Sequence, residues 1–437
     1  MTAPVAPTPQ LRGWGWGVTV ASLLAIGWAT LLPELDQVPG NHLCLICGTF
    51  GGVDALLNVI LFMPLGVGLA LLGCRATRAI AVAFALSAVI ELAQLLVVTG
   101  RDATIGDVLM NTVGGALGFA LTRYAASWLR PSPGEARRLI VWASVFWLLV
   151  QGACNYAFSV SLPASQYYGQ LARALGRWEV FAGKIYSARV DGIAIPNAKM
   201  SESEALRAAL LQGGPVVAAV TSAGATRGTA PIVRIADDSE REILLFAQRG
   251  NAALFGVRTG AAILRLRRPQ FLLPTAFPSA AIASNGADTI ILTGRYTGLE
   301  AGLSARSRAD SVGTQLPIFA SLGWILILPF DWFLHATRLE SILSIVWTAI
   351  LLIPLGYWAG LAAISGGIAD SQLRRVSFGL ALTVFVVFFG LTAIPMAFNL
   401  RIARPMDFLA AAIGVVIGLA VSKFSKTTYL PSRSIHD

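Results

Sequence analysis

Nine apolar stretches of about 18 to 22 residues dominate this sequence, and each is long enough to cross the roughly 30 Å hydrocarbon core of a membrane as a helix. They lie near residues 14–33, 55–74, 79–99, 106–124, 139–160, 316–334, 342–364, 376–397 and 406–422. Only 13% of the 437 residues are charged, against about 25% in a typical soluble domain. The chain is therefore predicted to be a polytopic α-helical membrane protein of about nine spans.

Residues 161–315 have a different character. Charges are frequent there, apolar runs shorten to strand length, and Gly, Pro, Asn and Asp interrupt them, as in GTAPIVRIADDSEREILLFAQRG. This pattern predicts an inserted all-β domain, a two-sheet sandwich or jelly roll. We expect an N-terminal tail (1–13), a first membrane domain (14–160), the β domain (161–315), a second membrane half (316–422) and a basic tail (423–437).

Positive charges orient the first half in the membrane. Arg75 and Arg78 follow the second span and four arginines (residues 123, 130, 137 and 138) follow the fourth, whereas the loop at 34–54 has no Lys or Arg. The positive-inside rule then predicts a cytoplasmic N-terminus and an external, periplasmic β domain in a bacterial inner membrane. The net charge of +10 is ascribed to such topology signals and to contact with the lipid bilayer, so no nucleic-acid partner is expected.

In the second half, the distribution of positive charges contradicts the positive-inside rule. Nine spans would place five positive residues outside (374, 375, 423, 426 and 433) and only three inside (338, 401 and 404). Either one span is miscounted, or the second half is an inverted-topology copy of the first.

A repeat is visible in the sequence. NVILFMPLG at 58–66 matches TAILLIPLG at 348–356, and at an offset of 300 Arg101, Asp107, Gly114 and Gly118 fall on Arg401, Asp407, Gly414 and Gly418. The copy has Thr, Leu, Ile and Ala where the first half has Asn58, Glu91, Gln94 and Asn111. A polar site, if the chain has one, is therefore predicted in the first half.

Ionisable and amide side chains inside spans are costly, so each is a functional hypothesis. Spacings of three or four place Glu91 with Gln94, and Asp107 with Asn111, on shared helix faces. We predict one external polar pocket formed by Asn58, Glu91, Gln94, Arg101, Asp102, Asp107 and Asn111. The alternative is an ion network that only fixes helix packing.

Other motifs are interpreted structurally. Pro64 and Gly66 are expected to kink the second span, and Gly114 and Gly118 to allow close helix contact. Cys44 and Cys47 predict a local disulfide in the external loop rather than a redox or zinc site. Asp237, Asp238 and Asp288 are interpreted as turn residues in preference to calcium ligands, and no metal site or cofactor is predicted.

The polar motifs also carry a family resemblance. N-x-x-x-F-x-P-L-G (58–66), E-x-x-Q (91–94) and R-D-x-x-x-x-D-x-x-x-N-x-x-G-G-x-x-G (101–118) resemble the VanZ-like membrane proteins of bacteria. The resemblance covers about residues 14–124 and, in degraded form, 317–422. It implies an integral protein of the cell envelope, in a family whose namesake is associated with tolerance of the glycopeptide teicoplanin. It implies no catalytic residue.

The strand pattern of the insert, from VDGIAIP to EILLFAQRGNAALFGVRTG, resembles the laminin-G or concanavalin-A-like jelly roll, which implies carbohydrate binding. We therefore expect a protein that engages a cell-envelope glycan, glycopeptide or lipid-linked precursor. Arg101 would contact an anionic group, Glu91 and Asp107 would accept hydrogen bonds or a proton, and Asn58 and Asn111 would orient the ligand. The alternatives are a membrane-embedded hydrolase or transferase, a transporter or flippase built on the repeat, and a non-catalytic receptor or scaffold.

Overall fold

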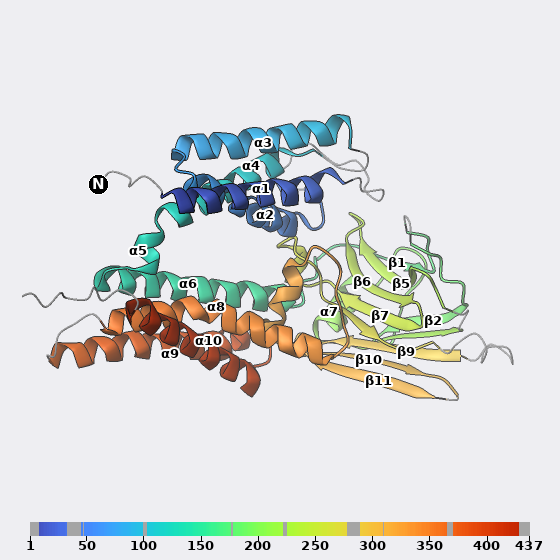
Figure 1. The fold of residues 1–437 in the computed structure, drawn as a ribbon. Coiled ribbons are helices and arrows are strands. Elements are labelled where there is room, and N and C mark those ends of the chain that lie inside the picture. The colour runs from blue at the N-terminus through green and yellow to red at the C-terminus, as the bar shows by residue number, and fades with distance from the viewer. Residues whose placement is uncertain are drawn as a thin grey trace, which may run out of the picture. The chain divides into compact units, whose positions relative to one another are not determined.

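The computed structural model describes residues 8–32, 45–46, 48–98, 103–175, 178–221, 225–277, 289–308, 310–364 and 370–427. The chain divides into two units, residues 1–139 and 140–437, which are described separately (Figure 1). Within the described residues, eight helices are long and apolar enough to cross a membrane.

The first unit is helical. Its elements are α1 (Pro9–Leu31), α2 (Gly51–Leu71), α3 (Ala76–Leu96), α4 (Ile105–Arg123), the short α5 (Ala125–Leu129) and the start of α6 (Pro133–Phe158). α2 is one continuous helix through Pro64. Phe62, Leu65, Ala83 and Phe119 pack in its core, while large apolar side chains such as Trp28 are exposed, as expected for surfaces that face lipid.

Glycines bring α2 and α4 into backbone contact. A Cβ added to Gly114 would overlap the carbonyl of Val59, one added to Gly118 would overlap that of Met63, and one added to Gly66 would overlap that of Gly115. Such close approach is the way in which membrane helices gain packing energy without a hydrophobic driving force between them. Gly114 and Gly118, the G-x-x-x-G of α4, thus lie at this close contact with α2.

The second unit contains the remaining helices and a β region. α6 leads into it, and α8 (Arg338–Ile364), α9 (Asp370–Ala397) and α10 (Pro405–Thr427) follow. One six-stranded sheet has the order β1 (Tyr167–Leu171), β5 (Thr229–Asp237), β6 (Glu242–Arg249), β7 (Ala252–Val257), β8 (Gln270–Leu273) and β12 (Phe333–Leu334). The other has the order β11 (Ser311–Pro317), β10 (Glu300–Arg306), β9 (Thr289–Tyr296), β4 (Val216–Thr221), β2 (Ile185–Val190) and β3 (Ile193–Ala194).

The two sheets share one core. All described strand pairs are antiparallel except β12 with β8. Phe271 of β8 packs on Tyr296 of β9 with ring centroids 5.4 Å apart, and residues of both sheets belong to the same buried cluster. The helix α7 (Ser203–Leu211) adds Leu206 and Leu210 to this core. The predicted all-β insert is therefore present as a two-sheet, sandwich-like region.

The sixth of the nine predicted spans, at 316–334, is wrong. This segment contains the end of β11, the 3-10 helix η3 (Ala320–Ile327) and β12. Its apolar side chains, among them Leu316, Ile318, Leu322 and Leu326, are buried in the core of the β region. The hydropathy of this segment is high because its side chains pack in a protein core and not against lipid. Since β11 ends at Pro317 and β12 spans Phe333–Leu334, the β region extends past the predicted boundary at residue 315.

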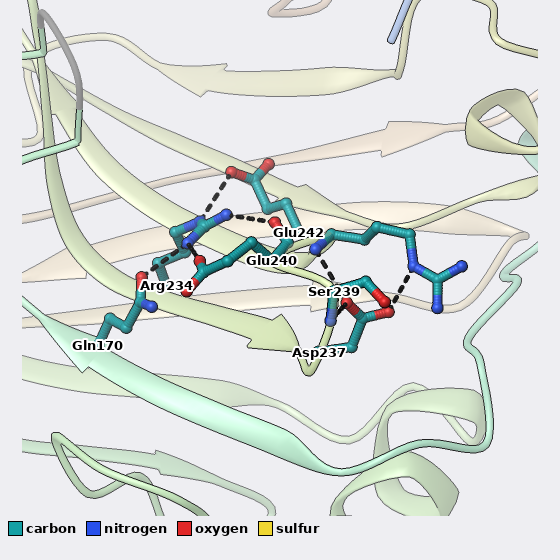
Figure 2. A network of polar contacts seen from close by, with 7 residues as sticks. Gln170, Arg234, Asp237, Ser239, Glu240 and Glu242 are labelled. Atoms are coloured by element: carbon teal, nitrogen blue, oxygen red, sulfur yellow. Dashed lines mark hydrogen bonds and ion pairs between the residues drawn. The ribbon is translucent and has the colours of Figure 1, made fainter. Parts of the chain in front are cut away.

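A polar network closes the β5–β6 hairpin (Figure 2). Asp237 accepts hydrogen bonds from the backbone N–H of Ser239 at 3.0 Å and of Arg241 at 2.9 Å, and the Arg241 side chain lies 2.7 Å from its other oxygen. Beside it, Arg234 donates to Gln170 and Glu240. The hydrogen bond from Arg234 holds the pKa of Glu240 below its ordinary value. Asp237 thus acts within the turn; Asp288 lies outside the described residues.

We expect Gly118→Leu to destabilise the first unit by about 1–3 kcal/mol, because the side chain would force α2 and α4 apart. Thermal unfolding of the purified protein in detergent measures the effect. The matched control is Gly27→Ala in α1, where an added Cβ meets nothing within 4 Å. Equal melting temperatures for both variants would contradict the packing role of Gly118.

Asp237→Ala should lower the free energy of unfolding by about 1–3 kcal/mol, since two turn N–H groups and the Arg241 side chain would lose the buried carboxylate that accepts them. The exposed neighbouring Asp238→Ala should stay within about 0.5 kcal/mol of wild type. Unfolding is measured with calcium and with a chelator. A calcium-dependent gain in stability that Asp237→Ala abolishes would instead support the calcium alternative.

Candidate functional site

Polar side chains gather where three helices of the first unit meet. Asn58 is in the second turn of α2, Glu91 and Gln94 are in the last two turns of α3, and Asp107 and Asn111 are in the first two turns of α4. Glu91, Gln94 and Asn111 are buried. α2 and α4 both begin at this end of the unit. Asn58 of α2 and Asp107 of α4, which are 49 positions apart in the chain, therefore come into direct contact.

The start of α4 is the centre of the arrangement. Thr104 is the N-cap residue, and its hydroxyl accepts the backbone N–H of Asp107 at 3.1 Å. The backbone N–H of Thr104 donates to the Glu91 carboxylate at 2.7 Å. Two carboxylates, Glu91 and Asp107, therefore flank one helix N-terminus, where the helix dipole favours negative charge.

Asn58 joins α2 to this centre. Its side-chain N–H donates to Asp107 at 2.6 Å. The predicted residues Asn58, Glu91 and Asp107 thus form one cluster with Thr104.

Gln94 and Asn111 are directed to neighbouring helices. Gln94 donates to the backbone carbonyl of Thr30 in α1 at 2.9 Å, and Asn111 donates to the Ser87 hydroxyl in α3 at 2.9 Å. The other side-chain oxygen of Asn111 is buried and has no hydrogen-bond partner among the described residues. These two side chains serve as cross-links between helices, and Asn111 keeps one acceptor for a further partner.

Three participants are additional to the predicted set: Thr104, Ser87 and Thr30. The spacing of Thr104 and Asp107 is a helix N-cap pattern and could have been found in the sequence. Ser87 is one turn before Glu91, so it too could have been placed on that face. Thr30 contributes only its backbone carbonyl, which no side-chain pattern reveals.

Several predicted residues lie outside the described part of the chain: Arg101, Asp102, Cys44 and Cys47. Within the described part, no group of three or more His, Cys, Asp or Glu side chains could hold a metal ion. The chemistry available is that of carboxylate acceptors beside amide and hydroxyl groups. Such a cluster can bind hydroxyl or ammonium groups or hold a proton.

These features define a polytopic α-helical membrane protein with an inserted two-sheet β region and a polar cluster at one end of its first helical unit. Residues 21–127 match the VanZ-LLP1 family, described as VanZ/LLP1. This part of the chain is therefore similar to VanZ-like membrane proteins, which confirms the resemblance found in the motifs. No curated protein and no solved structure matches the chain.

Replacement of Glu91 separates its structural role from its chemistry. Glu91→Leu should cost about 1–3 kcal/mol because the buried Thr104 N–H would lose its acceptor, whereas Glu91→Gln keeps an acceptor oxygen and should retain most of the stability. Melting temperatures of both variants in detergent test this. If Glu91→Leu were as stable as wild type, the contact with Thr104 would not support the start of α4.

Proposed function

We propose that this chain is an inner-membrane protein of the bacterial envelope whose first helical unit binds, at its external end, the polar head group of a cell-surface glycan, glycopeptide or lipid-linked precursor. The observation that carries the proposal is the convergence of Asn58, Glu91 and Asp107 around Thr104. Helix packing alone would be satisfied by neutral groups, and carboxylates at membrane depth are retained mostly for function.

The recount of spans supports an external location for this site. With eight spans and a cytoplasmic N-terminus, α3 ends and α4 begins outside, and α6 delivers the β region to the same compartment. Five positive residues of the second half (374, 375, 423, 426 and 433) then fall inside and three (338, 401 and 404) fall outside. The positive-inside rule is thus obeyed in both halves, which removes the conflict that nine spans created.

Helix contacts support the proposal that the second half is a parallel copy of the first. Added Cβ atoms on Gly414, Gly418 and Gly356 would overlap the carbonyls of Ala349, Ile353 and Val415. Each pair is the counterpart, at offsets of 290 and 300, of a pair in the α2–α4 contact. With eight spans α2 and α8 cross the membrane in the same direction, so a flippase built on an inverted repeat loses its main argument.

The polar groups of the copy are used differently. Arg404, at the position of Thr104, holds both oxygens of the buried Asp407 at 3.1 Å and stacks over Phe319 at 4.8 Å. Arg401 pairs with Glu300 of β10 at 3.1 Å. Charges at this end of the copy are therefore paired within the second unit.

In the proposed mechanism the carboxylates of Glu91 and Asp107 accept hydrogen bonds from hydroxyl or ammonium groups of the ligand, and Asn58 and Asn111 fix its orientation. Arg101 and Asp102, in the connection before α4, would contact its anionic and cationic groups. The β region would bind glycan independently, as its resemblance to jelly-roll lectins suggests. A hydrolase or transferase with Glu91 or Asp107 as general base is the second candidate, because two carboxylates flank one helix N-terminus.

The double variant Glu91→Gln, Asp107→Asn tests the proposal, because both substitutions preserve shape and remove charge. We expect wild-type protein in nanodiscs to bind a lipid-linked glycan precursor, and the variant to bind it at least about tenfold more weakly. Glycopeptide tolerance of cells that express the variant should fall to that of cells with an empty vector. Thr122→Val, in the last turn of α4, is the control.

Unchanged binding and tolerance in the double variant would overturn the proposal. Release of a cleaved or transferred product by wild-type protein alone would favour the enzyme.

Topology is tested by single cysteines in a background that lacks the four native ones. Cys at Ser187, exposed on β2, should react with an impermeant maleimide in intact cells, whereas Cys at Ser434 in the C-terminal tail should react only after permeabilisation. Protection of residue 187 would place the β region in the cytoplasm and contradict an envelope-facing role.

A further inference from the structure

A second set of polar side chains lies on α6, which is outside the repeat motifs. Ser144, Trp147, Gln151 and Asn155 follow one another at intervals of three, four and four residues, so they share one face of the helix. All four are no more than 5% exposed. Their neighbour on the same unit, Ile140, packs with α8, α9 and α10 in a common core, so this face of α6 is turned to protein.

Each of these four side chains has a polar atom without a partner. Ser144 Oγ, Trp147 Nε1, Gln151 Oε1 and Asn155 Oδ1 are buried and make no hydrogen bond among the described residues. In a membrane interior an unpaired donor or acceptor costs several kcal/mol, because no solvent replaces the missing partner. A single such atom can be a packing imperfection, whereas four on one helix face point to a ligand.

The facing elements extend the set. Trp347 of α8 has a buried Nε1 that is also unpartnered among the described residues. Gly323 of η3 lies against both Cys154 Sγ and Trp347 Nε1, and Gly390 of α9 lies against Trp147 Nε1. Gly390 lets the Trp147 indole approach the α9 backbone closely, since an added Cβ at residue 390 would come within 2.5 Å of Trp147 Nε1.

The chemistry of the set is uncharged. It offers two amide oxygens as acceptors, two indole N–H groups as donors and one hydroxyl that can do either. None of its members is ionisable, so a charged head group would enter without a counter-ion. Hydroxyl groups, which both donate and accept, match this combination best.

The set extends from the middle of α6 toward the end of the helix that leads into the β region. Asn155 is three residues before the end of α6 at Phe158, and Ser144 is near the middle of the helix. At about 1.5 Å per residue, the row of polar side chains from Ser144 to Asn155, here called the stripe, is about 16 Å long. The C-terminal end of α6 is held in place by Tyr296 of β9, which donates a hydrogen bond to the Phe158 carbonyl. Burial raises the pKa of Tyr296, so its hydroxyl stays a neutral donor.

We propose that Ser144, Trp147, Gln151, Asn155 and Trp347 form a second binding site, within the second unit, for an uncharged hydroxylated group such as the sugar ring of a neutral glycolipid. Sugar hydroxyls would donate to Gln151 and Asn155 and accept from the two indoles. The site is independent of the carboxylate cluster in the first unit and of the function proposed for it.

The test uses the full-length protein in a polyoxyethylene detergent, which has no sugar head group, with monogalactosyl diacylglycerol as probe. Native mass spectrometry should detect one bound glycolipid per chain, and phosphatidylglycerol should not compete with it. Gln151→Met and Ser144→Ala remove unpartnered atoms without loss of a described hydrogen bond, so both should fold. Each should weaken glycolipid binding by about tenfold.

Two controls make the result specific. Thr392→Val on α9 and Thr122→Val on α4, whose hydroxyls donate to backbone carbonyls of their own helices, should both bind as wild type does. Competition by methyl galactoside would identify the sugar itself as the ligand, whereas competition by glycolipid alone would show that the acyl chains are required; either result supports the site. Equal binding by Gln151→Met and wild type, or equal binding of phosphatidylglycerol, would overturn it.

Discussion

The backbone contact between α2 and α4 is the constraint on which the first unit depends. Gly114 lies against the carbonyl of Val59, and Val59 follows Asn58 directly in the chain. The hydrogen bond from Asn58 to Asp107 at 2.6 Å therefore requires the helices to be as close as glycine allows. A larger residue at 114 would separate the helices and break this hydrogen bond inside a membrane, where the loss of a polar contact costs most. Packing and polar chemistry are thus parts of one interaction.

Much of this could be predicted from sequence because it depends on local spacing. Eight helices follow from hydropathy, the helix contact follows from Gly114 and Gly118, and the shared face of Asp107 and Asn111 follows from a separation of four residues. The family match over residues 21–127 is confirmed independently of these patterns. Each of these inferences uses only the period of a helix and the composition of a short window.

The remaining features depend on tertiary contacts. Hydropathy could not separate the segment 316–334 from a membrane span, because the core of the β region and lipid favour the same side chains. Glu91 could be placed at depth by sequence, but its partner is a backbone N–H, which every residue except proline offers. The stripe on α6 was missed because Ser144, Gln151 and Asn155 are uncharged and each is unremarkable alone; only their common burial distinguishes them.

The helices separate polar chemistry by depth. Among the described carboxylates of the membrane-length helices, Asp54, Glu91, Asp107, Glu135, Glu340 and Asp407 all lie within two turns of a helix end, where backbone N–H groups and arginines can hold charge. Glu340, for example, accepts N–H groups from His335 and Thr337. Nearer the centre of α6 the polar groups are neutral, since a charge there would cost more than any single hydrogen bond returns. Two kinds of ligand chemistry can therefore coexist in one chain: ionic contacts where helices end, and neutral hydrogen bonds in their interior.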